Sequence, residues 1–379
     1  MTIPRRPLSE LPLSDLRIVE LAGIGPGPHA AMLLADHGAQ IIRIERATSA
    51  TATQPGETAA QPAWDVSIRG RRVVRADLKD ADDLARVRSL IGGADVLIEG
   101  FRPGVTERLG LGPEEMLSLN PRLIYGRMTG WGQDGPEAHA AGHDLNYIAR
   151  TGLLHLIGND GERGPVPPLN LVGDFGGGSM FLVLGILLAL HERERTGHGQ
   201  VVDAAIVDGA AALGASIWGK IGTGGFRDER GANFLDGSAP YYRCYACRDG
   251  LYLSVAAIER RFFDIVTDTL GLEPWPETVR LDPAQWPQIA EVLSEAFAGR
   301  TRAEWLEVFA GTDACIAPVR TMTEAPADEQ MAARDVYVDI DGTVQPRPAP
   351  RLSNHGPLAP PRMPTEVEDL EAVIRDWDL

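Results

Sequence analysis

Two short motifs place a titratable side chain where a predicted helix begins. His143 and Asp144 follow Gly142 ahead of an apolar helical stretch, and Asp174 precedes three glycines, 176–178, that open another. The exposed N–H groups at a helix start lower the pKa of a carboxylate and can stabilise a developing anion. Taken singly, Asp174 is better explained as an ordinary helix cap, and His143 as a surface histidine.

A third candidate, Glu259, stands where a short predicted strand meets a helix. A histidine, a carboxylate that orients it and an opposed aspartate are the groups that a two-base proton transfer requires. The sequence contains no G-x-S-x-G motif, and no cysteine has a histidine neighbour in sequence. A serine or cysteine hydrolase is therefore not indicated.

The first glycine-rich turn, 23–28, follows a predicted strand, and Glu45 lies about 20 residues further on, as in dinucleotide-binding proteins. Pro26 and Pro28, however, remove backbone N–H donors from the turn that would hold a pyrophosphate. We therefore interpret this segment as a tight strand-to-helix turn with close backbone packing.

Basic residues gather around the predicted strand ends of this acidic chain. They are Arg43, Arg46, Arg69, Arg71, Arg72, Arg75, Lys79, Arg102 and Arg108. Ligands of open α/β sheets bind outside the carboxyl ends of the strands, where arginines can bind phosphates bidentately. The alternative is a solvated rim that pairs with surplus carboxylates.

The chain has 379 residues, 44% of them hydrophobic, and a formal net charge of −17. The charge argues against a nucleic acid or an anionic membrane as partner. The apolar run at 180–190 is shorter than the roughly 20 residues that span a bilayer, and no signal-peptide pattern opens the sequence. We expect a cytoplasmic protein. Cys244 and Cys247 lack a second ligand pair, so we expect no metal.

Strands alternate with helices in the first half, which predicts an α/β fold with a parallel sheet. The predicted strands are 16–21, 40–44, 96–99, 123–128 and 251–255, and the predicted helices are 29–37, 81–91, 176–194, 259–270, 286–297 and 366–377. We expect a large domain over 1–200 that 326–379 completes, a linker over 201–224 and a small domain over 225–325.

The ordered set of motifs resembles the CoA-transferase family III superfamily, and within it the α-methylacyl-CoA racemases. The stretches that carry the resemblance are 18–23, 69–72 with 76–79, 98–105, 142–147, 173–178, 199–203, and 313–315 before Pro318. The resemblance implies a Rossmann-like large domain plus a smaller α+β domain, in an intertwined homodimer with active sites between subunits.

The resemblance also implies an activity in lipid and fatty acid metabolism, the inversion of the α-carbon of 2-methyl-branched acyl-CoA thioesters through an enolate. His143 and Asp174 would be the two acid/base groups, and Glu259 would pair with His143. CoA would be part of the substrate, with no separate cofactor. Its implied contacts are Ile24, Arg46, Ala76, Asp77, Leu78, Lys79, Gly100, Phe101, Arg102, Arg108, Gly142, Asp144 and Tyr147.

Two other functions remain open. A family III CoA-transferase would use Asp174 as a nucleophile and move CoA between carboxylic acids through an aspartyl-CoA intermediate. A non-catalytic acyl-CoA-binding protein would keep the arginines without needing the three acid/base groups. Arg260 and Arg261 follow Glu259, where racemases usually carry a proline, and their charge would favour a substrate with a carboxylate or another polar tail. Asp144 is the other possible partner for His143.

Overall fold

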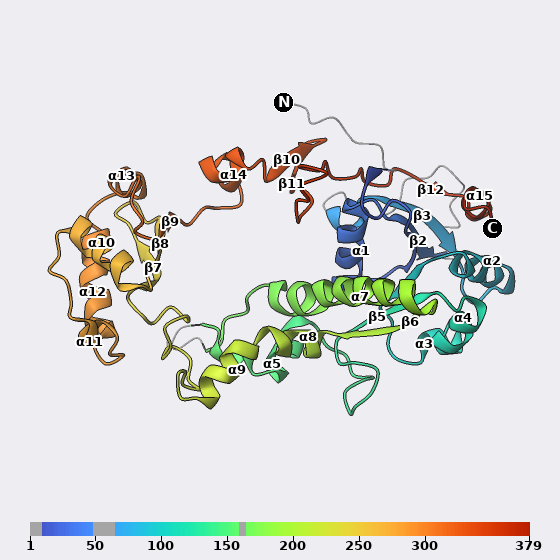
Figure 1. Ribbon diagram of the computed structural model, residues 1–379, viewed down its shortest axis with the longest axis horizontal. Coiled ribbons are helices and arrows are strands. Elements are labelled where there is room, and N and C mark those ends of the chain that lie inside the picture. The colour runs from blue at the N-terminus through green and yellow to red at the C-terminus, as the bar shows by residue number, and fades with distance from the viewer. Residues whose placement is uncertain (1–9, 48–64, 159–163) are drawn as a thin grey trace. The chain divides into compact units, whose positions relative to one another are not determined.

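The computed structural model describes residues 10–47, 65–158 and 164–379, which form two compact units. The large unit draws on Met1–Thr151, Leu169–Leu213 and Gln330–Leu379, and the small unit on Gly152–Pro168 and Gly214–Glu329. Figure 1 shows the elements of both.

The large unit is built on a seven-stranded parallel sheet with the order β12-β3-β2-β1-β4-β5-β6. From β3 to β6 this is the doubly wound strand order of nucleotide-binding sheets, in which the order of strand addition reverses between β1 and β4. The strands are β1 (Arg17–Leu21), β2 (Gln40–Arg46), β3 (Arg71–Ala76), β4 (Val96–Glu99), β5 (Ile124–Thr129), β6 (Gln200–Ala205) and β12 (Val367–Glu368). The predicted α/β class is confirmed.

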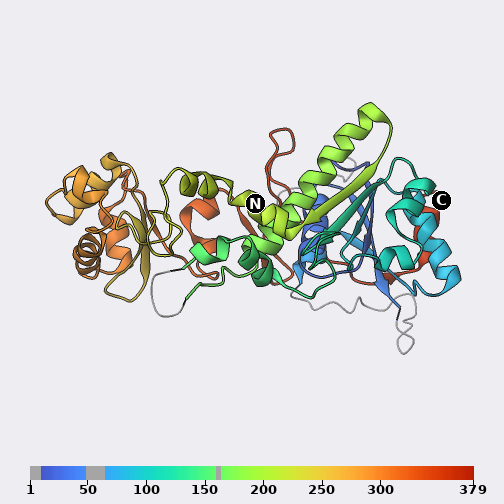
Figure 2. The ribbon, with the colours of Figure 1, turned by 90° about the horizontal axis from the view of Figure 1, so that it is seen from below.

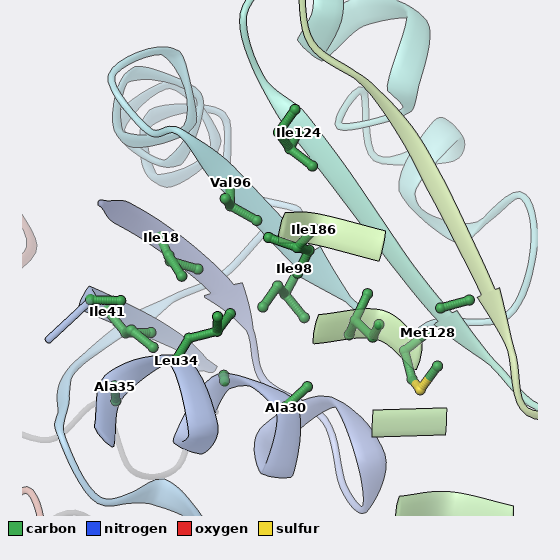
Figure 3. Close-up of a cluster of buried hydrophobic side chains, with 14 of the residues drawn as sticks. Ile18, Ala30, Leu34, Ala35, Ile41, Val96, Ile98, Ile124, Met128 and Ile186 are labelled. Carbon is green, nitrogen blue, oxygen red and sulfur yellow. The ribbon is translucent and has the colours of Figure 1, made fainter. Parts of the chain in front are cut away.

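Helices cover both faces of this sheet, as the nearly continuous burial of its central strands requires. On one face α1 (Pro26–Asp36) and α7 (Met180–Thr196) pack against β1, β4 and β5. Figure 3 shows Leu34 of α1 and Ile186 of α7 meeting Ile98 of the sheet. The other face is covered by α2 (Ala81–Gly92), α4 (Pro113–Leu119) and α15 (Leu370–Asp376).

A π-helix, Leu171–Ser179, leads directly into α7. Together they form a segment, Leu171–Thr196, that is long and apolar enough to cross a membrane, a test that core helices of soluble proteins also pass. Here α7 lies along β5 and β6 (Figures 1 and 2) and buries Leu182, Ile186 and Ala189 against the sheet.

The C-terminal residues complete the large unit. β12 pairs with β3 at the sheet edge, and Val373 and Trp377 pack into the same core as α2. Before them runs a hairpin of β10 (Tyr337–Ile340) and β11 (Thr343–Pro346). Arg69 links this hairpin to helix α1, since it donates to Gln345 at 2.8 Å and pairs with Asp36 of α1 at 2.6 Å.

The small unit is an α+β assembly around a three-stranded antiparallel sheet of β7 (Tyr242–Ala246), β8 (Tyr252–Ala256) and β9 (Ile316–Pro318). Aromatic side chains fill its core, among them Tyr245, Phe263 and Phe297. Its helices are α6 (Leu153–Leu156), α9 (Ala215–Gly222), α10 (Arg260–Leu270), α11 (Glu277–Arg280), α12 (Trp286–Phe297) and α13 (Arg302–Val308).

The segment expected to be a linker, 201–224, differs from the expectation. Gln200–Ala205 is the strand β6, because it pairs with β5 along its whole length, and α8 (Ile206–Leu213) and α9 follow. The large unit therefore extends to Leu213 before the chain enters the small unit. The strand β3 was also not expected, because its sequence RRVVRA was interpreted only as a basic patch.

Three of those basic residues are buried inside the large unit and bind carboxylates of the chain itself. Glu20 of β1, only 1% exposed, accepts from Arg43 at 2.5 Å and from Arg71 at 3.0 Å, and Arg69 pairs with Asp36. The prediction that Arg43, Arg69 and Arg71 bind phosphates is therefore wrong, because their charges are already paired inside the fold. Arg72 also has partners, Glu368 and Asp376.

We expect Glu20→Gln to lower the free energy of unfolding by about 3–5 kcal/mol, because it removes the carboxylate that two buried guanidiniums share and leaves Arg43 only its longer contact with Glu45 at 3.5 Å. Urea unfolding of the purified variant would measure this. The matched control is Glu368→Gln, which breaks the partly exposed pair with Arg72 and should cost less than about 1 kcal/mol. Equal losses in the two variants would contradict the central role of Glu20.

Candidate active site

A cavity of about 380 Å³ opens in the large unit at the carboxyl ends of β1 and β4, where the strand order reverses. This is the place where doubly wound sheets bind their ligands. Its walls come from the turn after β1, the loop after β4, the end of β5 and the starts of α5 (Asp144–Arg150) and the π-helix. Residues on its surface include Gly25, Pro26, Glu99, Arg102, Trp131, His143, Tyr147 and Asp174.

Asp174 lies in the π-helix, whose extra residue per turn is a feature often found at functional sites. Its carboxylate is half-buried, lies beside Gly25 of the first turn and accepts a 3.4 Å hydrogen bond from the amide of Asn170. Burial raises the pKa of Asp174 and outweighs the lowering by the hydrogen bond from Asn170; the nearby Asp144 adds a smaller increase and His143 a smaller decrease. The expected lowering by the helix start is therefore wrong, because burial outweighs it.

Glycines set the path of this π-helix. A Cβ on Gly209 of α8 would overlap the carbonyl oxygen of Gly177, and one on Gly177 would come within 2.6 Å of the backbone of Ala210. The backbones of the π-helix and of α8 are therefore in direct contact three residues after Asp174. The run of three glycines that marked this motif in the sequence is thus a packing requirement as well as a helix start.

His143 is the N-cap residue of α5 and its side chain is exposed. Its backbone N–H donates to the side-chain oxygen of Asn146 at 3.1 Å. Tyr147 fixes Gly142, the residue before His143, because its hydroxyl donates to the carbonyl of Gly142 at 2.5 Å and its ring leaves no room for a Cβ there. The cavity thus receives His143 and Asp174 from two different helices.

His29 on α1, which no motif in the sequence marks as functional, contacts the π-helix that carries Asp174. Its Nδ1 lies 2.6 Å from the hydroxyl of Ser179, and its ring stacks on Phe175 at 4.4 Å between centroids. Burial, with Arg69 and Arg71 nearby, lowers the pKa of His29, which keeps the ring neutral at pH 7. No sequence motif links His29 to a segment 150 positions away.

The loop after β4 is fixed by Glu99. This buried carboxylate accepts from the N–H of Phe101 at 2.7 Å and from Arg127 of β5 at 2.9 Å. The end of β5, which was not among the predicted site segments, also lines the cavity through Thr129, Gly130 and Trp131. The rule that ligands lie beyond the carboxyl ends of strands would have found them, since they follow a predicted strand.

The predicted CoA contacts fall into three groups. Six of them line the cavity: Ile24, Gly100, Phe101, Arg102, Gly142 and Tyr147. Another six lie outside it, at or after the ends of β2 and β3 or on α3 (Val105–Arg108): Arg46, Ala76, Asp77, Leu78, Lys79 and Arg108. Asp144 is the remaining one: its side chain is buried outside the cavity lining and accepts the backbone N–H of Asp174.

Glu259 belongs to the small unit, where it is the N-cap residue of α10 and is exposed. Its neighbour Arg260 pairs with Asp264 at 2.6 Å, whereas Arg261 has no carboxylate within 4 Å among the described residues and lies over the ring of Phe262. In the part of the chain that the structure describes, no three His, Cys, Asp or Glu side chains gather as a metal site.

The chain belongs to CoA-transferase family III, whose family profile matches residues 13–368. Relatives within the family include the α-methylacyl-CoA racemases of Mus musculus and Homo sapiens. Each is 42% identical to this chain, the mouse protein over 96% of this chain and 93% of its own length, and the human protein over 90% and 87%. A solved structure of a CaiB/BaiF family protein from Brucella suis superposes with a TM-score of 0.79 at 27% identity, covering 97% of this chain and all of that one.

The glycine contact behind Asp174 gives a stability prediction. Gly209→Ala should lower the free energy of unfolding by about 3 kcal/mol, because a methyl group there forces the two backbones apart. The control is Gly219→Ala in helix α9, where a Cβ meets nothing within 4 Å and alanine favours the helix. Thermal unfolding of both variants checks this, and an unchanged melting temperature for Gly209→Ala would refute the close contact.

Proposed function

We propose that this protein is a racemase that inverts the α-carbon of 2-methyl-branched acyl-CoA thioesters by two-base proton transfer. The observation that carries the proposal is the pair His143 and Asp174, which line one cavity at the switch point of the sheet. The 42% identity to two proteins named α-methylacyl-CoA racemase supports it.

In this mechanism one base removes the α-proton, and the electron pair of the broken C–H bond moves toward the thioester carbonyl to give a planar enolate. The other group then delivers a proton to the opposite face of the carbon. Reaction in both directions requires that the pair hold one proton between them at rest. The half-buried Asp174, with its raised pKa, is suited to carrying a proton nearer neutral pH than an exposed aspartate.

The enolate oxygen needs hydrogen-bond donors, which backbone N–H groups supply well. The first N–H groups of a helix have no partner inside the helix. Helix α5 begins at Asp144, directly after His143, and the N–H groups of Asn146 and Tyr147 already donate to the carbonyl of His143. We therefore assign this role to the N–H groups of Asp144 and Leu145. The start of the π-helix that leads to Gly176 is the other candidate.

We propose that the phosphates of CoA bind cations along the carboxyl ends of β2, β3 and β4. Arg46, Lys79, Arg102 and Arg108 are exposed, and none forms an ion pair with the described residues. They thus differ from Arg43, Arg69 and Arg71, whose charges carboxylates of the chain already neutralise. We keep Glu259 as the proposed partner of His143. Arg261, two residues further on, has no carboxylate partner among the described residues, and we propose that it favours an acyl group with a polar tail.

We also propose that a second copy of the chain covers the outer face of α7, in the intertwined homodimer that the family resemblance implies. Leu184, Leu187 and Leu188 form an exposed stripe there, between 41% and 60% exposed. Their spacing of three and four residues places them on one face of the helix. Contiguous apolar surface of this kind is typical of an interface.

The proposed chemistry is tested by proton NMR in D2O with a single enantiomer of a 2-methylacyl-CoA, with and without a free carboxylic acid. Exchange of the α-proton with loss of optical rotation, independent of the acid, would support the racemase. Absence of exchange, with a new acyl-CoA formed from the added acid, would instead identify a CoA-transferase with Asp174 as its nucleophile.

In the same assay, His143→Ala and Asp174→Ala should each reduce racemisation by at least about 10²–10³-fold, because each removes one of two required proton carriers. His139→Ala, an exposed histidine in the same segment that does not line the cavity, should keep normal activity. Normal activity in either alanine variant of the pair would remove that residue from the mechanism.

The dimer is tested by size-exclusion chromatography with light scattering, which measures the mass of the eluting protein. The unchanged chain should elute at twice its monomer mass, and Leu188→Lys should shift it toward the monomer, because an ammonium group would be buried in the apolar contact. The control Arg195→Glu changes an exposed charge at the end of the same helix and should leave the mass unchanged. A monomeric unchanged protein would contradict the proposal.

A further inference from the structure

Asp144 connects the two proposed acid/base groups. It follows His143 in the sequence, at the first position of α5, and its carboxylate Oδ1 accepts the backbone N–H of Asp174 at 2.7 Å. The side chain is 6% exposed and does not reach the cavity surface. One residue thus ties the start of α5 to the π-helix beside the cavity.

The contact has a steric requirement that Gly173 meets. A Cβ on Gly173 would overlap Oδ1 of Asp144 and press on Ile148 of α5. Only the absence of that side chain lets the carboxylate reach the N–H of the next residue. The Gly-Asp pair at 173–174 and the His-Asp pair at 143–144 are therefore joined by one contact, in which the first pair supplies the N–H and the space and the second supplies the carboxylate.

The charge of Asp144 is not neutralised by a cation. Its Oδ2 is buried without a hydrogen-bond partner among the described residues, and no ion pair involves it there. The polar groups that act on Asp174 are Asn170, Asp144 and His143. The charges of Asp174 and Arg102 in turn both act on the hydroxyl of Tyr147. After burial itself, Asp144 is what raises the pKa of Asp174.

We propose that Asp144 is a positioning residue for the racemase reaction: its carboxylate fixes the backbone of Asp174 relative to the start of the helix that carries His143, and it places a carboxylate without an ion-pair partner among the described residues beside that backbone. The proposal rests on the two-base function proposed above. The carboxylate of Asp144 is not among the groups that line the cavity, so this side chain does not touch the substrate.

Two variants separate the two effects. Asp144→Asn keeps an oxygen that accepts the N–H of Asp174 but removes the charge, whereas Asp144→Ala removes the acceptor as well. We expect Asp144→Asn to lose less than tenfold in kcat, with the acid limb of its pH–rate profile moved to lower pH. We expect Asp144→Ala to lose about 10²-fold in kcat with little change in KM, since it releases Asp174 from its position.

The matched control is Asp369→Asn. Asp369 accepts a backbone N–H, that of Ala372, at 2.8 Å at the start of α15, so the substitution makes the same change of charge and bond type outside the cavity. It should leave kcat and the pH profile unchanged. Thermal unfolding of all variants shows whether each is folded.

A second readout does not depend on activity. In protein labelled with ¹³C at the aspartate carboxyl carbons, the signal of Asp174 is assigned by its loss in Asp174→Asn and titrated with pH. The proposal predicts that the pKa of Asp174 is lower in Asp144→Asn than in the unchanged protein. An unchanged pKa together with normal kcat in Asp144→Ala would overturn it.

These outcomes separate this inference from the proposed function. If the unchanged protein does not exchange the α-proton, the racemase itself fails, and Asp144 has no such role. If it does exchange, but both Asp144 variants match it in kcat and pH profile, only the role of Asp144 is refuted.

Discussion

The buried contact of Glu20 with Arg43 and Arg71 holds the cavity together. Each arginine, besides its bond to Glu20, donates to a carbonyl: Arg43 to Gly23 in the turn after β1 at 3.2 Å, and Arg71 to Pro28 in the first turn of α1. Three neighbouring strands thus fix this turn and the start of α1. Because Pro26 and Pro28 have no N–H group, the position of this segment depends on bonds to its carbonyls. Gly25, the N-cap residue of α1 between the two bonded carbonyls, lies against Asp174.

Much of the large unit could be predicted from local sequence. The strand at 96–99 and the helix at 286–297 were predicted with their observed bounds, because their apolar patterns are regular and turns flank them. The strand β3 could not be, since three of its six residues are arginines. Their partners Glu20 and Glu368 lie 51 and 296 positions away. Periodicity reports which residues are apolar, but it does not report which charges are neutralised inside the fold.

The same limit applies to the site. Motifs and family resemblance selected His143 and Asp174, and the structure places both on one cavity. The direction of the pKa shift of Asp174 was predicted wrongly, because the sequence shows a helix start but does not show that the carboxylate is half-buried. The contacts made by Asp144 and His29 were missed for a related reason: they join segments 30 and 150 positions apart without any local pattern.

The edge strand of the main sheet comes from residues 367–368, and the small unit is contained within the large one in sequence. During synthesis the residues of the small unit, 214–329, therefore leave the ribosome before the large unit has its last strand and helix. The inserted unit can bury its aromatic core while the sheet is still open along β3. Until residue 376 has emerged, the core around α2 remains uncovered where α15 will pack, and a nascent chain offers chaperones a binding surface that the finished protein no longer has.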